Sequence, residues 1–339
     1  MRGRMPWPAG LDSDVRPEVR AWFAGRTSLG TDWDRRKLVE AKGTATVSIV
    51  LPAHNEAATV GAIVERLRRE LVESFALVDE IVVIDSGSSD RTAAVARAAG
   101  ATVVRQDQVL AELGDRPGKG EALWKSLFVT RGDIVAFIDA DLHEFDTQFA
   151  VGLLGPLLTD PLVHFVKGFY DRPLDVGNTV LPAGGGRVTE LLARPLLNLH
   201  YPALAGIVQP LAGEYAARRP LLERLPFVSG YGVEIAMLVD VLEEVGLDAM
   251  AQVDLGRRMH RNSSDAALGR MAAQVYLALV SRLERHARGV LMSEPETTLT
   301  QFVRDGEVFV PEVTAVGVTE RPPIGTLEEY RRRLIGEPS

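Results

Sequence analysis

The chain has 339 residues, 46% of them hydrophobic and 25% charged, with a formal net charge of −8. This balance is typical of a folded globular protein and argues against a general nucleic-acid binder, which would carry an excess of basic residues. No cysteine is present, so disulfides, thiolate catalysis and cysteine-ligated zinc are excluded. Without an apolar run near the ~18 residues of a membrane span, or a secretory signal at the start, we expect a cytoplasmic location.

The first half of the chain alternates between apolar runs and amphipathic runs. After a polar stretch at 1–45 with a short helix expected at 15–23, we expect strands at 46–53, 79–84, 101–105 and 132–138, and helices at 57–72, 91–99 and 121–129. This alternation predicts a mainly parallel α/β sheet flanked by helices.

The second half is less regular. We expect strands at 163–169, 206–211 and 248–255, a loop at 171–181, and helices at 184–199, 230–245 and 265–288, followed by a mixed tail.

Two carboxylates follow the apolar run at 132–138. Asp139 and Asp141 are two residues apart, so in a strand both side chains point to the same side of the sheet. The carboxyl edge of an open α/β sheet is where such folds bind ligands. Paired carboxylates there suit a divalent cation that also takes oxygens from a phosphate. The alternative is that one aspartate caps the following turn.

Polar turns also follow the two preceding strands. Glu56, in Pro52-Ala53-His54-Asn55-Glu56, and Asp85, in the turn at 85–90, either accept hydrogen bonds from a ribose or base, or act as helix caps. Neither GxGxxG after the first strand nor GxxxxGK[ST] is present. Their absence argues against a dinucleotide-binding Rossmann site and a P-loop.

Two basic segments are candidates for anion binding. Lys119, between Gly118 and Gly120, offers a point charge on a mobile backbone that suits a diphosphate, or it is a solvated loop lysine. Gly184-Gly185-Gly186-Arg187 opens a helix, where backbone N–H groups and the guanidinium could hold a phosphate or carboxylate. A tight turn without a ligand is the alternative for this second segment.

His260 lies in a basic stretch at 257–262. A lone histidine is usually structural, but this cluster favours an anionic ligand, and neutral imidazole is a good metal ligand. Glu234, after Tyr231-Gly232-Val233, either complements the dipole of a helix start or faces a reacting sugar.

Taken together, the motifs at 48–56, 83–90 and 139–141 resemble those of GT-A nucleotide-sugar glycosyltransferases. The segments at 116–124, 184–191, 210–216 and 230–235 resemble a narrower group, the actinobacterial glucosyl-3-phosphoglycerate and mannosyl-3-phosphoglycerate synthases, over about 45–290. The resemblance implies a Rossmann-like GT-A fold with a mixed, mainly parallel sheet. It also implies four parts: an N-terminal arm (1–45), a nucleotide-sugar-binding subdomain (46–160), an acceptor-binding and catalytic subdomain (161–290) and a C-terminal tail (291–339).

The same resemblance implies retaining transfer of a hexose from a nucleoside diphosphate to the 2-hydroxyl of 3-phosphoglycerate, for compatible-solute synthesis. It implies a divalent metal, Mg²⁺ first with Mn²⁺, Co²⁺ or Zn²⁺ as alternatives. Apart from the resemblance, we expect a homodimer, and neither a nucleic-acid nor a membrane partner. The donor-binding positions it implies are Pro52, Ala53, Glu56, Ser86, Lys119, Asp139, Ala140, Asp141 and Arg258. The acceptor-binding positions are Gly186, Arg187, Thr189 and Asn262, the metal ligands are Asp141 and His260, and the catalytic positions are Glu234, Asp139 and Lys119.

The donor itself is left open by two departures from the glucosyl enzymes. Ala140 stands where those enzymes carry serine, and His54 stands where they carry an apolar residue. Whole-chain likeness favours the mannosyl enzyme and GDP-mannose, with UDP- or GDP-glucose as the alternative. A sugar-phosphate nucleotidyltransferase would carry a glycine-rich basic signature after the first strand, and a non-catalytic sugar-nucleotide-binding protein would lack the metal carboxylates or the acceptor loop.

Overall fold

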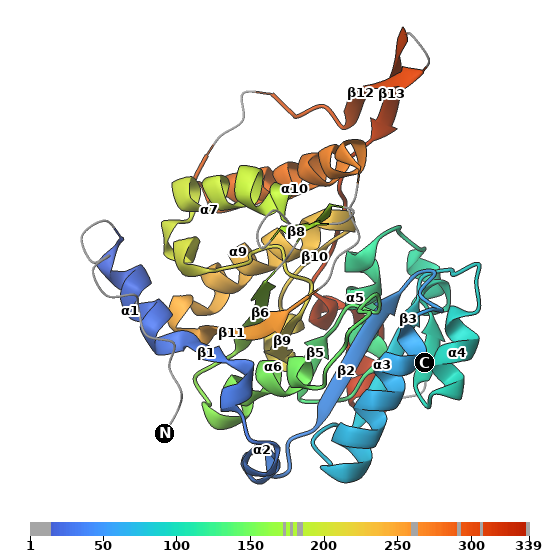
Figure 1. The fold of residues 1–339 in the computed structure, drawn as a ribbon, viewed down its shortest axis with the longest axis vertical. Coiled ribbons are helices and arrows are strands. Elements are labelled where there is room, and N and C mark those ends of the chain that lie inside the picture. The colour runs from blue at the N-terminus through green and yellow to red at the C-terminus, as the bar shows by residue number, and fades with distance from the viewer. Residues whose placement is uncertain are drawn as a thin grey trace.

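A computed structural model shows a central eight-stranded sheet with helices on both faces (Figure 1). The structure describes residues 15–171, 174–176, 179–181, 186–258, 264–289, 293–305 and 308–336. Strand order across the sheet is β1-β11-β6-β9-β5-β2-β3-β4. Only β9 runs antiparallel to its two neighbours, and every other adjacent pair in this sheet is parallel. The mixed, mainly parallel sheet that the sequence predicts is therefore confirmed.

The strands of this sheet are β1 (Thr27–Leu29), β2 (Val47–Ala53), β3 (Glu80–Asp85), β4 (Thr102–Arg105), β5 (Ile134–Phe137), β6 (Phe165–Asp171), β9 (Tyr215–Arg218) and β11 (Met250–Arg257). Three two-stranded sheets pair β7 (Leu174–Val176) with β8 (Thr179–Leu181), β10 (Phe227–Val228) with β14 (Glu320–Arg321), and β12 (Thr298–Asp305) with β13 (Val308–Ala315).

The α-helices are α1 (Pro17–Arg26), α2 (Arg35–Lys42), α3 (Val60–Leu67), α4 (Thr92–Ala98), α5 (Lys119–Val129), α6 (Gln148–Thr159), α7 (Arg194–His200), α8 (Arg219–Leu222), α9 (Val233–Val245), α10 (Asp265–Arg285) and α11 (Glu328–Leu334). None of the described helices is long and apolar enough to cross a membrane.

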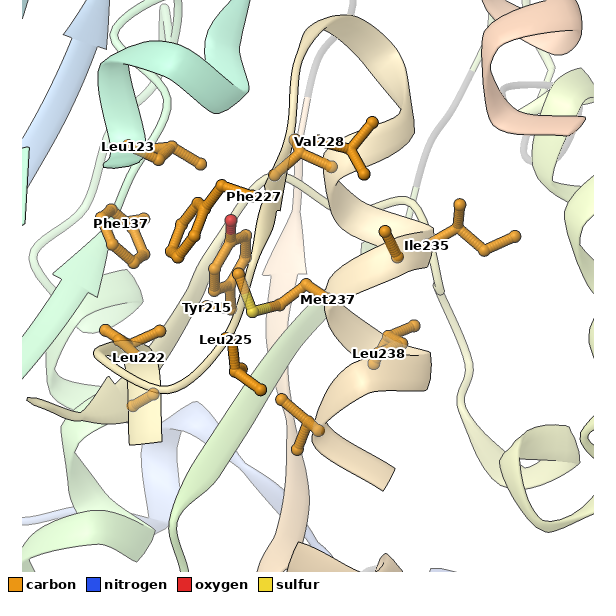
Figure 2. Packing of buried hydrophobic residues seen from close by; sticks show 14 of the residues in the cluster. Leu123, Phe137, Tyr215, Leu222, Leu225, Phe227, Val228, Ile235, Met237 and Leu238 are labelled. Carbon is orange, nitrogen blue, oxygen red and sulfur yellow. The ribbon is translucent and has the colours of Figure 1, made fainter. Parts of the chain in front are cut away.

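Two hydrophobic cores lie on opposite faces of the sheet, because side chains alternate along each strand. On β5, Val135 and Phe137 face the core formed with α5 and α9, whereas Ile134 and Ala136 face the core formed with α3 and α6. Figure 2 shows the first core, where Phe137, Tyr215 and Phe227 pack between α5 and α9. Helix α10 covers the outer side of α9 (Figure 1). The two helices that begin at the ligand-binding edge are thus fixed by apolar packing.

The strand expected at 206–211 is wrong. Residues Pro202–Gly206 form a 3₁₀ helix, and the strand in this region is β9, which begins at Tyr215. The side chain of Gln252 explains the difference, because its amide donates to the carbonyl of Gly206 and its oxygen accepts from the N–H of Val208. With these backbone groups bonded to a side chain, the apolar segment packs into the core without joining the sheet.

The loop expected at 171–181 is also wrong, because β7 and β8 pair there as a hairpin. The sequence carries the signal in Gly177-Asn178, a turn pair between two short runs of strand-forming residues. The expected helix at 57–72 is present but is divided into α3 and a π-helical segment, Arg68–Ser74. Strand β1, from the polar stretch at 1–45, pairs with β11 at the sheet edge. The division into four parts stays a prediction.

Candidate active site

The candidate site lies where β2, β3 and β5 end and where α5 and α9 begin (Figure 1). Asp139 and Asp141 follow the last residue of β5, Lys119 is the first residue of α5, and Glu234 is the second residue of α9. The site is therefore assembled from segments that are far apart in the sequence. The positive ends of two helix dipoles point toward it, which favours bound anions.

Lys119 is the centre of a largely buried ion-pair network. Its Nζ donates to Asp139 Oδ1 at 2.5 Å and lies 3.2 Å from Glu234 Oε1. Burial acts to lower the pKa of Lys119, but the charges of Asp139 and Glu234 outweigh it and raise the pKa well above its usual value. Lys119 therefore stays charged, and it holds the carboxylates of Asp139 and Glu234 close to each other.

The glycines beside Lys119 have a packing role that differs from the mobile backbone expected from the sequence. Gly118 has a φ of +102°, and a Cβ there would lie 2.6 Å from the backbone nitrogen of Gly230. A Cβ on Gly120 would overlap the backbone of Val228. The Gly-Lys-Gly segment is therefore tightly packed at the start of α5, and it fixes the lysine in place.

Arg258 joins the two aspartates. Its Nη1 donates to Asp139 Oδ2 at 3.0 Å, and its Nη2 donates to Asp141 Oδ1 at 2.7 Å. Burial would raise the pKa of Asp139, but the charges of Lys119 and Arg258 hold it well below its usual value. Asp139 and Asp141 therefore face one side chain, although both lie after the end of β5 at Phe137 and outside the strand in which their spacing was expected to align them.

The core side of the site contains residues that the sequence did not single out. Glu214 Oε1 accepts from Arg258 Nη1 at 2.6 Å, and the Tyr170 hydroxyl accepts from the same nitrogen at 2.8 Å. Burial raises the pKa of Glu214, although Arg258 opposes the shift. Lys167 lies beside them on β6 and is fully buried. The available signal was a lysine inside the mostly apolar run at 163–169.

The expected nucleotide-binding residues lie together at the ends of β2 and β3. Pro52 and Ala53 pair in register with the last residues of β3, and Ser86 N donates to Ala53 O at 2.9 Å. Ser86 Oγ donates to the buried amide oxygen of Gln106 at 2.7 Å. His54 Nδ1 lies 2.9 Å from the Ser86 carbonyl oxygen. These turns are fixed largely by hydrogen bonds between neutral groups.

Glu56 and Ala140 lie next to this group. Glu56 lies just before α3, and its backbone N–H donates to Thr92 Oγ1 at 2.8 Å. Thr59 Oγ1 donates to the Ala140 carbonyl oxygen at 2.6 Å. The start of α3 is thereby tied to the Asp-Ala-Asp segment. The expected donor-binding residues thus line neighbouring strand ends of one sheet edge.

The expected acceptor residues are only partly described. Gly186 has a φ of +81°, Thr189 is buried, and Arg187 Nη1 donates to Asp265 Oδ1 at 2.6 Å. Gly184, Gly185, His260 and Asn262 lie outside the described residues. Arg187 is thus held at the start of α10.

For the metal, the described residues contain no group of three or more acidic or histidine side chains that could hold an ion. Asp141, with its side chain 51% exposed, is accessible to a cation from the solvent side. A carboxylate at the end of a strand, beside the region of a diphosphate, fits a divalent cation that completes its coordination with phosphate oxygens.

The fold and this edge of the sheet define a nucleotide-sugar glycosyltransferase, and the family model "Glycosyl transferase family 2" matches residues 48–187. The glucosyl-3-phosphoglycerate synthase of Mycolicibacterium smegmatis is 49% identical over 306 residues, which cover 90% of this chain and 98% of that protein. The chain belongs to the family of glucosyl- and mannosyl-3-phosphoglycerate synthases.

Solved structures agree with this assignment and with the GT-A fold. The mannosyl-3-phosphoglycerate synthase from Rubrobacter xylanophilus matches with a TM-score of 0.84 and 43% identity, over 92% of this chain and 98% of that one. The glucosyl-3-phosphoglycerate synthase from Mycobacterium tuberculosis, in complex with Mn²⁺, uridine diphosphate and phosphoglyceric acid, matches with a TM-score of 0.76 and 46% identity, over 86% and 94% of the two chains.

Proposed function

We propose that the protein transfers a hexose, with retention of configuration, from a nucleoside diphosphate to the 2-hydroxyl of 3-phosphoglycerate. The observation that carries the proposal is the convergence of Lys119, Asp139 and Glu234, from three separate elements, at one edge of the sheet in a chain that is 49% identical to a named glucosyl-3-phosphoglycerate synthase. In this reaction the bond from the anomeric carbon to the diphosphate breaks, and a bond to the acceptor oxygen forms. The hydroxyl proton passes to an oxygen of the leaving diphosphate.

Each charged residue has a proposed role that follows from its position in the site. Arg258 and Lys119 stabilise negative charge that develops on the leaving group, and their fixed geometry limits reorganisation during the step. Asp139 and Glu234 face the hexose and hold its hydroxyls. Asp141 and His260 would hold a divalent cation, which would supply further positive charge to the diphosphate.

The acceptor carries a phosphate and a carboxylate, and the proposal assigns both to Gly186, Arg187, Thr189 and Asn262. Arg187 would exchange its ion pair with Asp265 for a bidentate pair with one of these anions. Such an exchange conserves one charge-assisted contact, so acceptor binding need not leave the guanidinium unpaired.

The identity of the hexose has support on two sides. The relative at 49% identity is named as a glucosyl enzyme, which favours glucose. The TM-score of 0.84 to the mannosyl enzyme favours the GDP-mannose that sequence likeness predicts. We give glucose first place, because the higher identity extends over nine-tenths of the chain, and GDP-mannose stays an untested prediction.

One assay tests the function and the donor together. Purified protein is incubated with 3-phosphoglycerate, Mg²⁺ or Mn²⁺, and GDP-mannose, GDP-glucose, UDP-glucose or ADP-glucose in turn. We expect release of nucleoside diphosphate that requires both the acceptor and the metal, and a product with the anomeric configuration of the donor. Release that does not depend on 3-phosphoglycerate, or a product with inverted configuration, contradicts the proposal.

A cytoplasmic homodimer is also part of the proposal. The hairpin of β12 and β13 extends away from the main body beyond α10 (Figure 1), so it offers surface to a second copy. Sedimentation equilibrium of the full chain measures this directly, and deletion of the hairpin residues 298–315 is expected to shift the mass to that of a monomer.

A further inference from the structure

Lys167 is a buried charged residue for which the proposed mechanism has no use. It lies in the middle of β6 and is 1% exposed, between Val166 and Gly168. Within the described part of the chain, its Nζ has no hydrogen-bond partner. Burying an ammonium group without a partner is costly, so a fold gains nothing in stability from a lysine at this position. A role in the site explains its presence better than packing does.

The surroundings of Lys167 connect it to the site. It pairs in register with Tyr215 of β9, and its Nζ lies 4.7 Å from the centre of the tyrosine ring. The Tyr215 hydroxyl is also buried without a partner among described residues. Figure 2 shows the rings of Phe137, Phe227 and Tyr215 next to one another in the core beside α9. Lysine and tyrosine thus present polar atoms at the top of an apolar core.

Charged groups face Lys167 from every neighbouring element. They are Glu234 from α9, Lys119 from α5, Glu214 from the start of β9 and Asp139 after β5, with the neutral amide of Gln252 opposite it on β11. Burial lowers the pKa of Lys167 to about 7, and the charge of Glu234 opposes this shift more than any other group. None of the ion pairs among the described residues includes Lys167, so its charge acts on these carboxylates through space.

Charge balance explains what the lysine would do. Four carboxylates lie at this edge, those of Asp139, Asp141, Glu214 and Glu234. Among the described side chains, only two cations form direct ion pairs with them, Lys119 and Arg258. Lys119 is shared between Asp139 and Glu234. Without a third positive charge, Glu234 would compete with Asp139 for one ammonium group, and a negatively charged donor would meet an excess of negative charge.

We propose that Lys167 is a positioning residue for hexose transfer, whose charge acts on the Glu234 carboxylate from the core side without direct contact, while Lys119 forms an ion pair with it from the α5 side. The inference rests on the proposed function, in which Glu234 faces the hexose. Lys167 does not touch the substrate. Its effect is to fix the orientation of Glu234 and to lower the negative charge beneath the sugar.

The experiment compares Lys167→Met and Lys167→Gln with wild type. Each variant removes the charge at similar length. We expect kcat to fall at least about tenfold, since a displaced carboxylate misplaces the sugar. Affinity for the free nucleoside diphosphate with metal, measured by calorimetry, should stay within about twofold, because the nucleotide turns lie at β2 and β3. The melting temperature of Lys167→Met should stay the same or rise.

Lys42 provides the matched control. It is a buried lysine remote from the site, and its Nζ pairs with Asp79 at 2.8 Å and donates to the Ala76 carbonyl oxygen. Lys42→Met should lower the melting temperature and leave kcat unchanged. We therefore expect opposite patterns for the two lysines. Lys167→Met should lower kcat without lowering the melting temperature, whereas Lys42→Met should lower the melting temperature without lowering kcat.

Three outcomes overturn the inference. These are a kcat within about twofold of wild type in both Lys167 variants, a loss of kcat that accompanies a lower melting temperature, and an equal loss of nucleoside diphosphate affinity. A wild-type protein that transfers no hexose from any donor contradicts the proposed function instead. The ratio of variant to wild-type rates and the wild-type rate itself therefore report on separate claims.

Discussion

The two ends of the proposed donor region, which we call the nucleotide end and the hexose end, are built in different ways. At the nucleotide end, Ser86, Ala53 and Gln106 are joined by hydrogen bonds between neutral groups in the turns after β2 and β3. At the hexose end, Lys119, Arg258 and their carboxylate partners form ion pairs that are largely removed from water. Neutral hydrogen bonds are individually modest, whereas breaking a buried ion pair leaves a charge uncompensated. Substitutions should therefore be far more severe at the hexose end.

The largest expected effect is that of Asp139→Asn. The change removes the negative charge shared by Lys119 and Arg258, at 2.5 and 3.0 Å. We expect kcat to fall by about a hundredfold to a thousandfold, and unfolding free energy to fall by roughly 3 kcal/mol because two buried cations lose a partner. Steady-state rates and urea unfolding measure the two effects.

The control for Asp139 lies at the other end of the same strand segment. Asp133 accepts from Thr46 N and Thr46 Oγ1 at 2.8 Å, in an exposed position. Asp133→Asn should cost no more than about 1 kcal/mol of stability and leave kcat unchanged. Equal losses of activity in both variants would erase the distinction between the two ends of β5.

Gly213→Ala is expected to have the next largest effect. A Cβ at Gly213 would overlap the Asp139 carboxylate and lie 2.5 Å from Lys119 Nζ, so the ion pair would have to move. A displacement of about 1 Å at this position should lower kcat by about tenfold to a hundredfold. Gly25→Ala is the control, because a Cβ there meets nothing within 4 Å. An active Gly213→Ala enzyme would show that the hexose end tolerates rearrangement.

The same contrast explains what the sequence could predict. The nucleotide end follows from local patterns, since strands such as Val47–Ala53 and Glu80–Asp85 end in polar turns that are visible in the chain. The hexose end depends on β9, whose antiparallel insertion brings Glu214 and Tyr215 between β5 and β6. That insertion was missed because the apolar segment before it resembled a strand. Without β9, the sequence could not predict which residues lie next to the buried Lys167.

The aspartate pair shows how far a local pattern reaches. The i, i+2 spacing of Asp139 and Asp141 predicts a common direction within a strand. Both residues instead follow the end of β5 at Phe137, and they converge because Arg258 donates a hydrogen bond to each. The sequence did not indicate that Lys119 would pair with Asp139 and Glu234, because these residues come together only through packing of α5 and α9 on the sheet. Such contacts depend on how distant helices and strands pack together, and the periodicity of apolar residues along the chain does not predict that packing.

A smaller effect, on stability, comes from the buried charge of Lys167 and depends on pH. Its folded-state pKa of about 7 lies below the ordinary lysine value, so the unfolded chain binds more protons between these values. The destabilisation by Lys167 is therefore complete below about pH 7 and fades as pH rises toward about 10. The melting temperature of Lys167→Met should exceed that of wild type most at about pH 6–7, and the two melting temperatures should converge near about pH 10.

Thermal scans of both proteins across that pH range test this sign. Lys42→Met serves again as the comparison, because Lys42 is paired with Asp79 and its loss should lower the melting temperature. A Lys167→Met advantage that grows with pH would contradict a buried, weakly basic lysine at the hexose end.

The smallest effect is expected at the nucleotide end, from Ser86→Ala. The variant leaves the Gln106 amide oxygen without the hydroxyl that lies 2.7 Å away, at a cost of about 1 kcal/mol. Gln106 Nε2 still donates to Asp115 and to the Arg116 carbonyl oxygen, so the turn should remain folded. We expect KM for the donor to rise by about threefold to tenfold with kcat unchanged, because the contact supports ground state and transition state alike. A fall in kcat as large as that of Gly213→Ala would mean that the neutral turns and the ion-pair network act as one unit, and that the nucleotide and hexose ends are not separable.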